Sequence, residues 1–212
     1  MIITNIFPPY IGFSCVTMAE TKPLLSSEES LLSPYATEKR KNDFLLGRTA
    51  AHQALEQLHY FQTPILQGAN NEPIWPKNII GSITHSNEIG VAVATSTKYG
   101  SGIGIDLEQL HTKNKWNLVH HICLDSEKKY AQQTKNPSQT LLLLFSAKES
   151  IYKAFFPLCQ SVLRFHDCEL QPYSKNSFLA HWHNPIPQQY ISHPFPVHFQ
   201  LYENYIFTYC MI

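Results

Sequence analysis

The sequence predicts an α+β fold in which small antiparallel sheets pack against helices. Two observations lead to this class. Apolar residues recur at helical spacing in the segments that follow Thr37 and Gln139, while short runs with β-type patterning occupy residues 79–107 and 163–212. The mixed order of these elements along the chain implies α+β. With 212 residues, 43% of them hydrophobic, the chain can bury one substantial core or two small ones.

The N-terminal part of the chain contains the first expected helix. Residues 1–35 hold four prolines and a stretch rich in serine and glutamate, so we expect an irregular or partly helical lead-in. A helix is expected from Thr37, which can serve as its N-cap. Its apolar positions fall at helical spacing: Phe44, Ala51, Leu55 and Leu58.

Three short runs in the middle of the chain predict strands. Residues 62–78 are rich in proline, glycine and asparagine, which is typical of a loop. The runs at 79–84, 89–95 and 102–107 follow this loop, and together they predict a small antiparallel sheet.

The C-terminal part is expected to begin with helices and to end with strands. Residues 127–133 and 139–156 have helical patterning, and Pro157 is expected to end the second helix. From residue 163 onward the patterning is of the β type but interrupted by prolines, which predicts strands joined by proline-rich loops.

Composition excludes several classes of protein. Sixteen basic residues balance sixteen acidic ones, so no global field favours nucleic-acid or membrane binding. The longest apolar run, Leu141–Phe145, is far below the roughly 20 residues of a membrane span. The N-terminus lacks the basic lead-in of a secretory signal, so we expect a cytoplasmic protein. The five cysteines are widely spaced without a CxxC pair, which favours reduced thiols.

Two carboxylates lie close together in GIGIDLEQL. On a strand, residues two apart point to the same side, so Asp106 and Glu108 would share one face. Paired hard oxygens suit magnesium, which often shares its coordination sphere with phosphate. A solvated strand end with two surface acids explains the same pattern, and these residues alone do not decide between the two.

A second charged group lies in FSAKESIYKAF. Glu149 and Lys153 are one helical turn apart, and Lys148 is expected on a neighbouring part of the same surface. This arrangement is compatible with a simple ion pair. It is equally compatible with a glutamate that completes a metal site or accepts a proton, beside lysines that neutralise phosphate.

Polar and basic groups further toward the N-terminus could bind an anion. Thr84 and His85 follow an apolar strand and offer hydrogen-bond donors, although a single histidine at a strand end often has only a structural role. Arg40, Lys41 and Arg48 lie on the first predicted helix. They form either a solvated basic edge or a phosphate clamp, since guanidinium groups bind phosphate in bidentate fashion.

The order and spacing of these groups resemble the 4'-phosphopantetheinyl transferase superfamily, in particular the enterobactin synthetase component D group of its Sfp-type branch. The resemblance rests on five segments that follow in the expected order: RKNDFLLGRTAAHQAL, PILQGANNEPIWP, GSITHS, GIDLE and FSAKESIYKAF. It covers about residues 38–157. It implies two similar α+β halves related by pseudo-twofold symmetry, here expected at 1–100 and 101–212, with coenzyme A in the cleft between them and a monomeric enzyme.

The resemblance also implies an activity and its residues. The enzyme would transfer the 4'-phosphopantetheine of coenzyme A to a serine of an apo acyl or peptidyl carrier protein and release 3',5'-ADP. Asp106, Glu108 and Glu149 match the magnesium ligands, and Glu149 also matches the base for the serine. Lys148 and Lys153 match residues that hold the pyrophosphate and offset charge on the leaving group. Further matches are to coenzyme A contacts, chiefly phosphate contacts: Arg40, Arg48, Thr84 and His85.

Some features depart from the family or match nothing in it. The family loop usually has a basic residue and a glycine where this chain has Gln67 and Asn71, and Asn71 can adopt the left-handed turn that glycine would provide. The C-terminal histidines are irregularly spaced, which favours surface and packing roles: His181, His183, His193 and His198. Two other functions use the same residues, namely a metal-dependent phosphodiesterase acting on coenzyme A or a nucleotide, and a catalytically silent coenzyme A binding module.

Overall fold

The chain divides into two compact units, Met1–Ile103 and Gly104–Ile212. This division lies three residues from the expected boundary between residues 100 and 101. The computed structural model describes residues 3–110, 116–161, 163–183 and 193–212. The segments with Pro185 and Pro187, expected to be loop, lie outside these residues.

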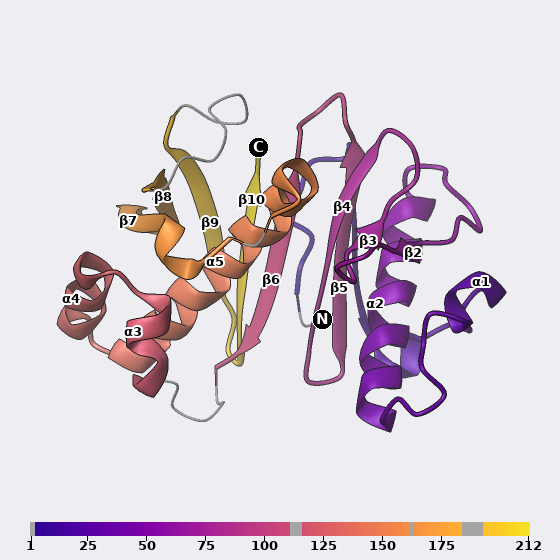
Figure 1. Cartoon of the computed structure of the whole chain (residues 1–212), viewed down its shortest axis with the longest axis horizontal. Helices are drawn as coiled ribbons and strands as arrows, with labels where there is room; N and C mark the ends of the chain where they lie inside the picture. Colours follow the sequence, from indigo (N-terminus) through magenta and orange to yellow (C-terminus); the bar gives the residue numbers. More distant parts are fainter. Residues whose placement is uncertain (1–2, 111–115, 162, 184–192) are drawn as a thin grey trace. The chain divides into compact units, whose positions relative to one another are not determined.

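Unit 1 is a three-stranded antiparallel sheet with one long helix on its face (Figure 1). The strand order is β1-β5-β4, so β5 is central. Thr37 caps α2 as expected, because its hydroxyl oxygen accepts a hydrogen bond from the Arg40 amide at 3.2 Å. The elements in chain order are β1 (Ile11–Thr17), η1 (Met18–Glu20), α1 (Ser26–Glu29), α2 (Glu38–Glu56), β2 (Leu66–Gln67), β3 (Pro73–Ile74), β4 (Ile79–Ser86) and β5 (Ile89–Ser96).

Unit 2 is a five-stranded antiparallel sheet in the order β6-β10-β9-β8-β7, with the long helix α5 against it (Figure 1). Its core consists of the apolar side of α5, including Leu144, Ile151 and Phe155, together with the sheet side chains that α5 covers. The elements are β6 (Ile103–Gln109), η2 (Trp116–Leu118), α3 (Val119–Ile122), α4 (Asp125–Gln133), α5 (Pro137–Cys159), η3 (Phe165–Asp167), β7 (Cys168–Ser174), β8 (Ser177–Trp182), β9 (Phe195–Leu201) and β10 (Tyr205–Met211).

The two units share one plan. Each begins with an edge strand, continues through a short helix and a long helix, and ends in a hairpin whose last strand pairs with the first. In each, a glycine is the second residue of the first strand and lies against the long helix. A Cβ at Gly12 would overlap the carbonyl oxygen of Ala54, and one at Gly104 would overlap that of Ser150. The similarity of the halves agrees with the family fold; their pseudo-twofold placement stays a prediction.

Three expectations about the elements are wrong. Residues 11–17 form the strand β1 within the lead-in that was expected to be irregular or partly helical, although the helix α1 agrees with that expectation. The run at 102–107 is not part of the sheet formed by the two runs before it, because β6 pairs with β10 in unit 2. Pro157 does not end α5, which continues to Cys159 and is closed by Gln160 in the left-handed conformation, φ 47°.

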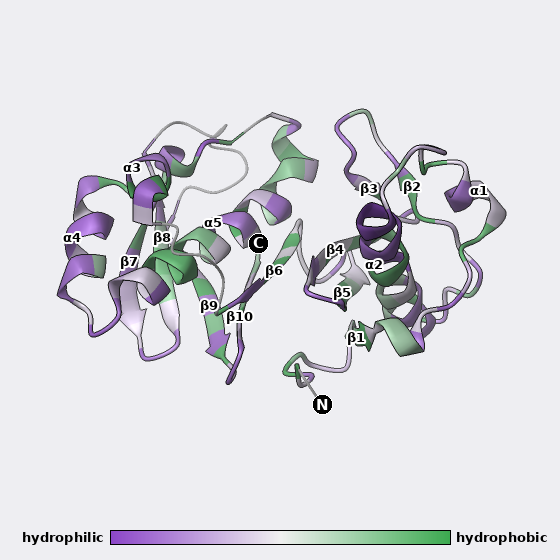
Figure 2. Ribbon diagram, turned by 90° about the horizontal axis from the view of Figure 1, so that it is seen from below, coloured by the Kyte–Doolittle hydropathy of each residue, from purple (hydrophilic) through white to green (hydrophobic). Residues whose placement is uncertain are grey.

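Hydropathy differs among the helices of unit 2. Figure 2 shows α4 largely hydrophilic, whereas α5 carries long hydrophobic stretches that belong to the core. Within the described ranges, no helix combines the length and the apolar character that crossing a membrane would require.

Candidate functional site

The face of β6 toward α5 carries the two predicted acids. Successive residues of a strand point to opposite sides, so Gly104, Asp106 and Glu108 share one face. This face is the one toward α5, because Gly104 has no side chain and the backbone of α5 at Ser150 can therefore come close to it. Asp106 and Glu108 therefore point to the side of the sheet on which α5 lies.

Asp106 is held by two side chains of α5. Only 6% of its surface is exposed. Its Oδ2 accepts a hydrogen bond from the Ser146 hydroxyl at 2.8 Å, and its Oδ1 accepts one from Lys153 Nζ at 2.7 Å. Lys153 also donates to the carbonyl oxygen of Ile105 at 3.1 Å. A buried carboxylate needs such a cationic partner, because an unpaired charge is costly to remove from water.

Glu149 lies on the same side of α5 as these two residues. Positions 146, 149 and 153 follow each other at intervals of three and four, and therefore form one stripe along the helix. Because Ser146 and Lys153 both reach Asp106, the stripe between them faces the acidic side of β6. The half-buried Glu149 is thus on the side of α5 that faces the strand with Asp106.

The donor set suits a hard divalent cation in its chemistry. Asp106, Glu108 and Glu149 offer only carboxylate oxygens, and magnesium is usually held by one or two carboxylates together with phosphate and water. The described residues bring no three His, Cys, Asp or Glu side chains together as a formed metal cage. The cation beside Asp106 is instead the ammonium group of Lys153. The magnesium assignment therefore stays a prediction.

A cavity of about 210 Å³ lies on the other side of Glu149. Its lining is mainly apolar and includes Tyr152, Phe165 and Trp182. Lys148 and Arg164 also contribute to the lining. Trp182 Nε1 is buried and makes no hydrogen bond with the described part of the chain. Glu149 therefore separates the acidic face of β6 from a mostly apolar space in the same unit.

The structure does not bring Lys148 to this stripe. At 100° per residue, position 148 is 140° around the helix from position 153. Lys148 is 4% exposed, and its ammonium group donates to Glu127 Oε2 at 2.7 Å and to the carbonyl oxygens of Phe165 at 2.7 Å and Ile122 at 3.0 Å. All three protons are used within unit 2. The expectation that Lys148 shares a surface with Lys153 is wrong.

In unit 1, Arg40 and Arg48 flank one aromatic ring. The guanidinium carbons lie 5.9 Å and 4.6 Å from the centroid of Phe44, which stands between them on α2. Arg40 is exposed, whereas Arg48 is 6% exposed and its Nε lies 3.8 Å from Glu28 Oε1. Burial lowers the pKa of Arg48, Glu28 opposes this effect, and the charge of Arg40 adds to it. An anion between the two cations would relieve their repulsion.

Thr84 and His85 point to opposite faces of the unit 1 sheet. Ile83 packs on Gly47 of α2, so His85, two residues further, lies on the α2 side, where its Nδ1 is 3.6 Å from Asp43 Oδ1. The buried Thr84 belongs to the other face. The structure thus groups His85 with the arginines of α2 and does not group Thr84 with them.

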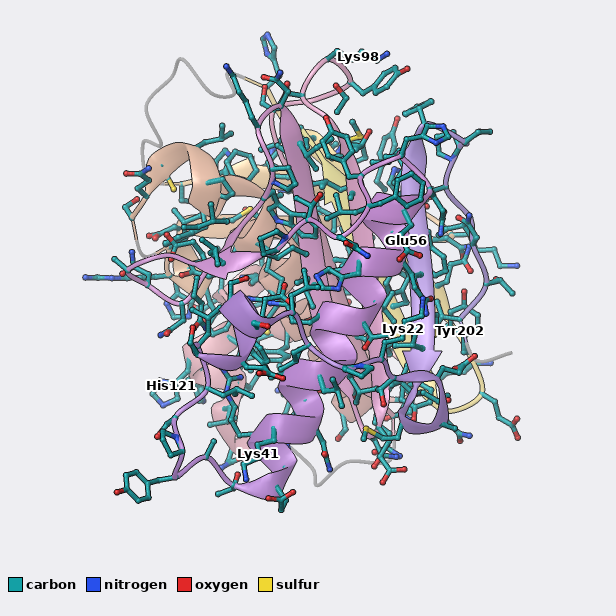
Figure 3. The ribbon with its side chains drawn as sticks, turned by 90° about the vertical axis from the view of Figure 1, so that its right-hand side faces the viewer. Lys22, Lys41, Glu56, Lys98, His121 and Tyr202 are labelled. Carbon is teal, nitrogen blue, oxygen red and sulfur yellow. The ribbon has the colours of Figure 1, made fainter. Side chains whose placement is uncertain are left out.

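The remaining basic and polar groups are at the surface. Figure 3 shows Lys41 at the first turn of α2, where its Nζ lies 2.8 Å from Glu38 Oε1. Asn71 adopts the left-handed conformation, φ 65°, as expected. His183 pairs with Glu169 at 2.9 Å, and His198 stacks on Tyr209. These contacts agree with surface and packing roles for the two histidines.

The expectation of reduced cysteines is confirmed, because all five are free thiols. Burial raises the pKa of Cys123 and of Cys210 to about 12. Thiols of this kind are inert at neutral pH, since the thiolate is the reactive form.

Comparison with known proteins identifies the family. A model described as the 4'-phosphopantetheinyl transferase N-terminal domain matches residues 27–95, and a model described as the 4'-phosphopantetheinyl transferase superfamily matches residues 102–210. The chain belongs to the 4'-phosphopantetheinyl transferase superfamily. The resemblance carried by the five sequence segments is confirmed.

Curated relatives of the chain agree with its membership in this superfamily. It is 32% identical over 178 residues to enterobactin synthase component D of Escherichia coli (strain K12), a match covering 83% of this chain and 79% of that protein. It is 35% identical over 144 residues to the 4'-phosphopantetheinyl transferase PptT of Mycobacterium tuberculosis and 32% to Npt of Nocardia iowensis. Those two matches cover 68% of this chain but only 63% and 64% of the relatives, which is less than two thirds of their length.

Several residues that build the candidate site were not anticipated from the sequence. Ser146, which hydrogen-bonds Asp106, lies three residues before Glu149 on the same stripe, so helical spacing could have found it. Phe44 lies midway between the two arginines, at intervals of four. Glu127 gives no such signal, because its partner Lys148 is 21 residues away and depends on tertiary packing.

Proposed function

We propose that this chain transfers the 4'-phosphopantetheine of coenzyme A to a serine hydroxyl of an apo acyl or peptidyl carrier protein and releases 3',5'-ADP. The observation that supports it most is the arrangement in unit 2, where Asp106 binds Lys153 and Ser146 on the stripe of α5 that also holds Glu149. Membership in the transferase superfamily supplies the reaction class.

Glu149 is the proposed base. It lies between the acidic face of β6 and the mainly apolar cavity, so a serine that approaches through the cavity side would meet its carboxylate. As the serine oxygen attacks the β-phosphorus, a new oxygen–phosphorus bond forms and the pyrophosphate bridge breaks. The hydroxyl proton passes to Glu149, directly or through water, and the bridging oxygen leaves with 3',5'-ADP.

Lys153 is the proposed counter-charge for the phosphates. Two of its three ammonium protons go to Asp106 and to the Ile105 carbonyl, which fixes the direction of the side chain. The third proton remains for a phosphate oxygen, and 26% of the side chain is exposed to receive it. A preorganised cation of this kind stabilises negative charge that develops in the transition state.

A magnesium ion is the proposed cofactor, held by Asp106, Glu108 and Glu149. It would supply charge neutralisation and alignment of the pyrophosphate oxygens. In unit 1, Arg40, Arg48 and His85 are proposed phosphate contacts, and Thr84, on the opposite face of its sheet, is the fourth proposed coenzyme A contact. Lys148 is left out of the proposed phosphate site because its protons are already used.

The carrier protein and its pathway are also proposals. The name enterobactin synthase component D belongs to several relatives and favours siderophore synthesis over polyketide, nonribosomal peptide or fatty-acid synthesis for this chain. A monomeric, cytoplasmic enzyme stays our expectation.

The test is a mass measurement on the carrier. Purified protein is incubated with coenzyme A, Mg²⁺ and several apo carrier proteins, and a gain of about 340 Da on a carrier is expected for an attached phosphopantetheine arm. Asp106→Ala and Glu149→Gln should abolish the gain while circular dichroism shows the fold intact. Hydrolysis of coenzyme A without carrier modification would instead indicate a phosphodiesterase. Binding of coenzyme A without either reaction would indicate a silent module.

A further inference from the structure

Among the described residues, each unit has one buried glutamate that accepts hydrogen bonds from two backbone amides and contacts a side-chain nitrogen of the long helix. In unit 2, Glu127 is 1% exposed; its Oε2 accepts from the Leu124 amide at 2.7 Å and its Oε1 from the Leu170 amide at 2.8 Å. In unit 1, Glu28 is fully buried and accepts in the same way from the amides of Leu25 at 3.3 Å and Ile65 at 2.8 Å. Each glutamate thus joins the start of a short helix to the segment that follows the long helix.

The long helix supplies a side chain to each glutamate from the same position. His52 Nε2 lies 2.9 Å from Glu28, and Lys148 Nζ lies 2.7 Å from Glu127. His52 is two residues before Ala54, which faces Gly12, and Lys148 is two residues before Ser150, which faces Gly104. Measured from these glycine contacts, His52 and Lys148 are equivalent. The contact between a buried glutamate and a side chain of the long helix therefore belongs to the backbone arrangement that both units share.

Lys148 also fixes the wall of the cavity beside Glu149. Its bond to the Phe165 carbonyl holds the segment that contributes Leu163, Arg164 and Phe165 to that cavity. Its bond to the Ile122 carbonyl holds the end of α3. Lys148 thus connects α5, immediately before Glu149, with the opposite side of the space that Glu149 borders.

We infer that Lys148 is a positioning residue that acts through Glu127 and the Phe165 segment to set the distance between Glu149 and the cavity wall. This rests on the proposed function, because it assigns Glu149 the role of base. Lys148 then affects the rate of transfer rather than the binding of coenzyme A phosphates.

Variants that lack Lys148, Glu127 or both distinguish a positioning role of Lys148 from a direct contact with coenzyme A phosphates. Lys148→Met leaves Glu127 as a buried unpaired charge, and the double variant with Glu127→Gln removes that charge. We expect Lys148→Met to lower kcat more than tenfold with little change in KM for coenzyme A. The double variant should recover part of the lost kcat, because it removes the buried charge. It should stay below Glu127→Gln alone, because it still lacks the bond from Lys148 to the Phe165 carbonyl.

A matched control comes from unit 1. His52→Met combined with Glu28→Gln disrupts the equivalent pair, and should lower the melting temperature without changing kcat at saturating coenzyme A. A more than tenfold rise in KM for coenzyme A in both Lys148 variants would overturn the inference in favour of a phosphate contact. Unchanged kcat in Lys148→Met with a lowered melting temperature would overturn it in favour of a purely structural role.

If the proposed function itself is wrong, the parent protein modifies none of the carriers, and this result differs from every outcome above. Calorimetric titration with coenzyme A then decides the role of Lys148. A double variant with the affinity of the parent supports positioning, and one with more than tenfold weaker binding overturns it.

Discussion

The two units have the same frame but differ in charge at three equivalent positions. Counted from Gly12 and from Gly104, Ser14 in unit 1 is equivalent to Asp106 in unit 2. Counted from Ala54 and Ser150 on the long helices, Gln53 is equivalent to Glu149 and Gln57 to Lys153. Unit 1 therefore has a neutral hydroxyl and two amides where unit 2 has two carboxylates and an ammonium group.

One hydrogen bond at these positions is common to the two units, and unit 1 has a second one between two of its side chains. Gln57 Nε2 donates to the carbonyl oxygen of Phe13 at 2.7 Å, and Lys153 Nζ donates to that of Ile105 at 3.1 Å. Ser14 Oγ donates to Gln53 Oε1 at 2.7 Å. Unit 1 does not lack space, because a cavity of about 650 Å³ is lined by these same residues among others. The comparison teaches that the shared backbone arrangement positions the side chains, and that of these two sets only the one in unit 2 has the charges that the proposed transfer requires.

The largest expected effect is on the rate of transfer, which should depend on Lys153 but not on the equivalent Gln57. Lys153→Ala should lower the rate of transfer about 10²- to 10³-fold, because loss of one preorganised transition-state contact costs about 2.7–4 kcal/mol. Gln57→Ala removes the equivalent contact in unit 1 and should leave the rate of the folded protein unchanged. Both rates are measured by mass spectrometry of the carrier. An equal loss of transfer rate in the two variants would contradict the proposed difference between the units.

The two glycines give a smaller and partly shared effect. Gly12→Ala and Gly104→Ala each place a Cβ onto the backbone of a long helix, and overpacking of this kind costs about 1–3 kcal/mol of unfolding free energy. Urea unfolding measures that loss. Only Gly104→Ala should also lower kcat, by up to about 10²-fold, because it displaces Asp106 from α5 and misplacement by about 1 Å can have that effect. An unchanged kcat in Gly104→Ala would show that the contact does not position the site.

The smallest effect concerns the pH dependence of unit 1. Burial of Glu28 raises its pKa, but hydrogen bonds from His52 and the Ile65 amide outweigh this, and the pKa lies below the ordinary 4.5. A lowered pKa in the folded state adds stability above the unfolded pKa, which is lost as the pH falls through the folded value. Glu28→Gln should therefore cost about 1–3 kcal/mol at pH 7 and less below pH 4.5, as measured by urea unfolding. A cost independent of pH would contradict the ionised Glu28.

Local patterns predicted the acidic pair, the helix stripe and most element types, because each depends on residues close in sequence. Asp106 and Glu108 follow from strand alternation, and Glu149 with Lys153 from one helical turn. Helical spacing alone separates Lys148 from Lys153 by about 140°, so the expectation that the two share a surface was an avoidable error. The partners of Lys148 could not be predicted, because tertiary packing brings Glu127 and Phe165 to it.

The prolines of residues 1–35 favoured an irregular lead-in, so the strand β1 was missed. The alternation of Ile11, Phe13 and Cys15 with small residues could have found it. The sheet to which β6 belongs depends on pairing with β10, roughly a hundred residues later.

The central claim is that the acidic face of β6, together with Glu149, binds the divalent ion used in transfer. Binding of Mn²⁺ in the presence of coenzyme A, followed by electron paramagnetic resonance, tests it most directly. The parent protein and Ser14→Ala should bind Mn²⁺ with the same affinity, whereas Asp106→Ala and Glu149→Gln should bind at least tenfold more weakly. Asp106→Ala binding Mn²⁺ as tightly as the parent would contradict the account.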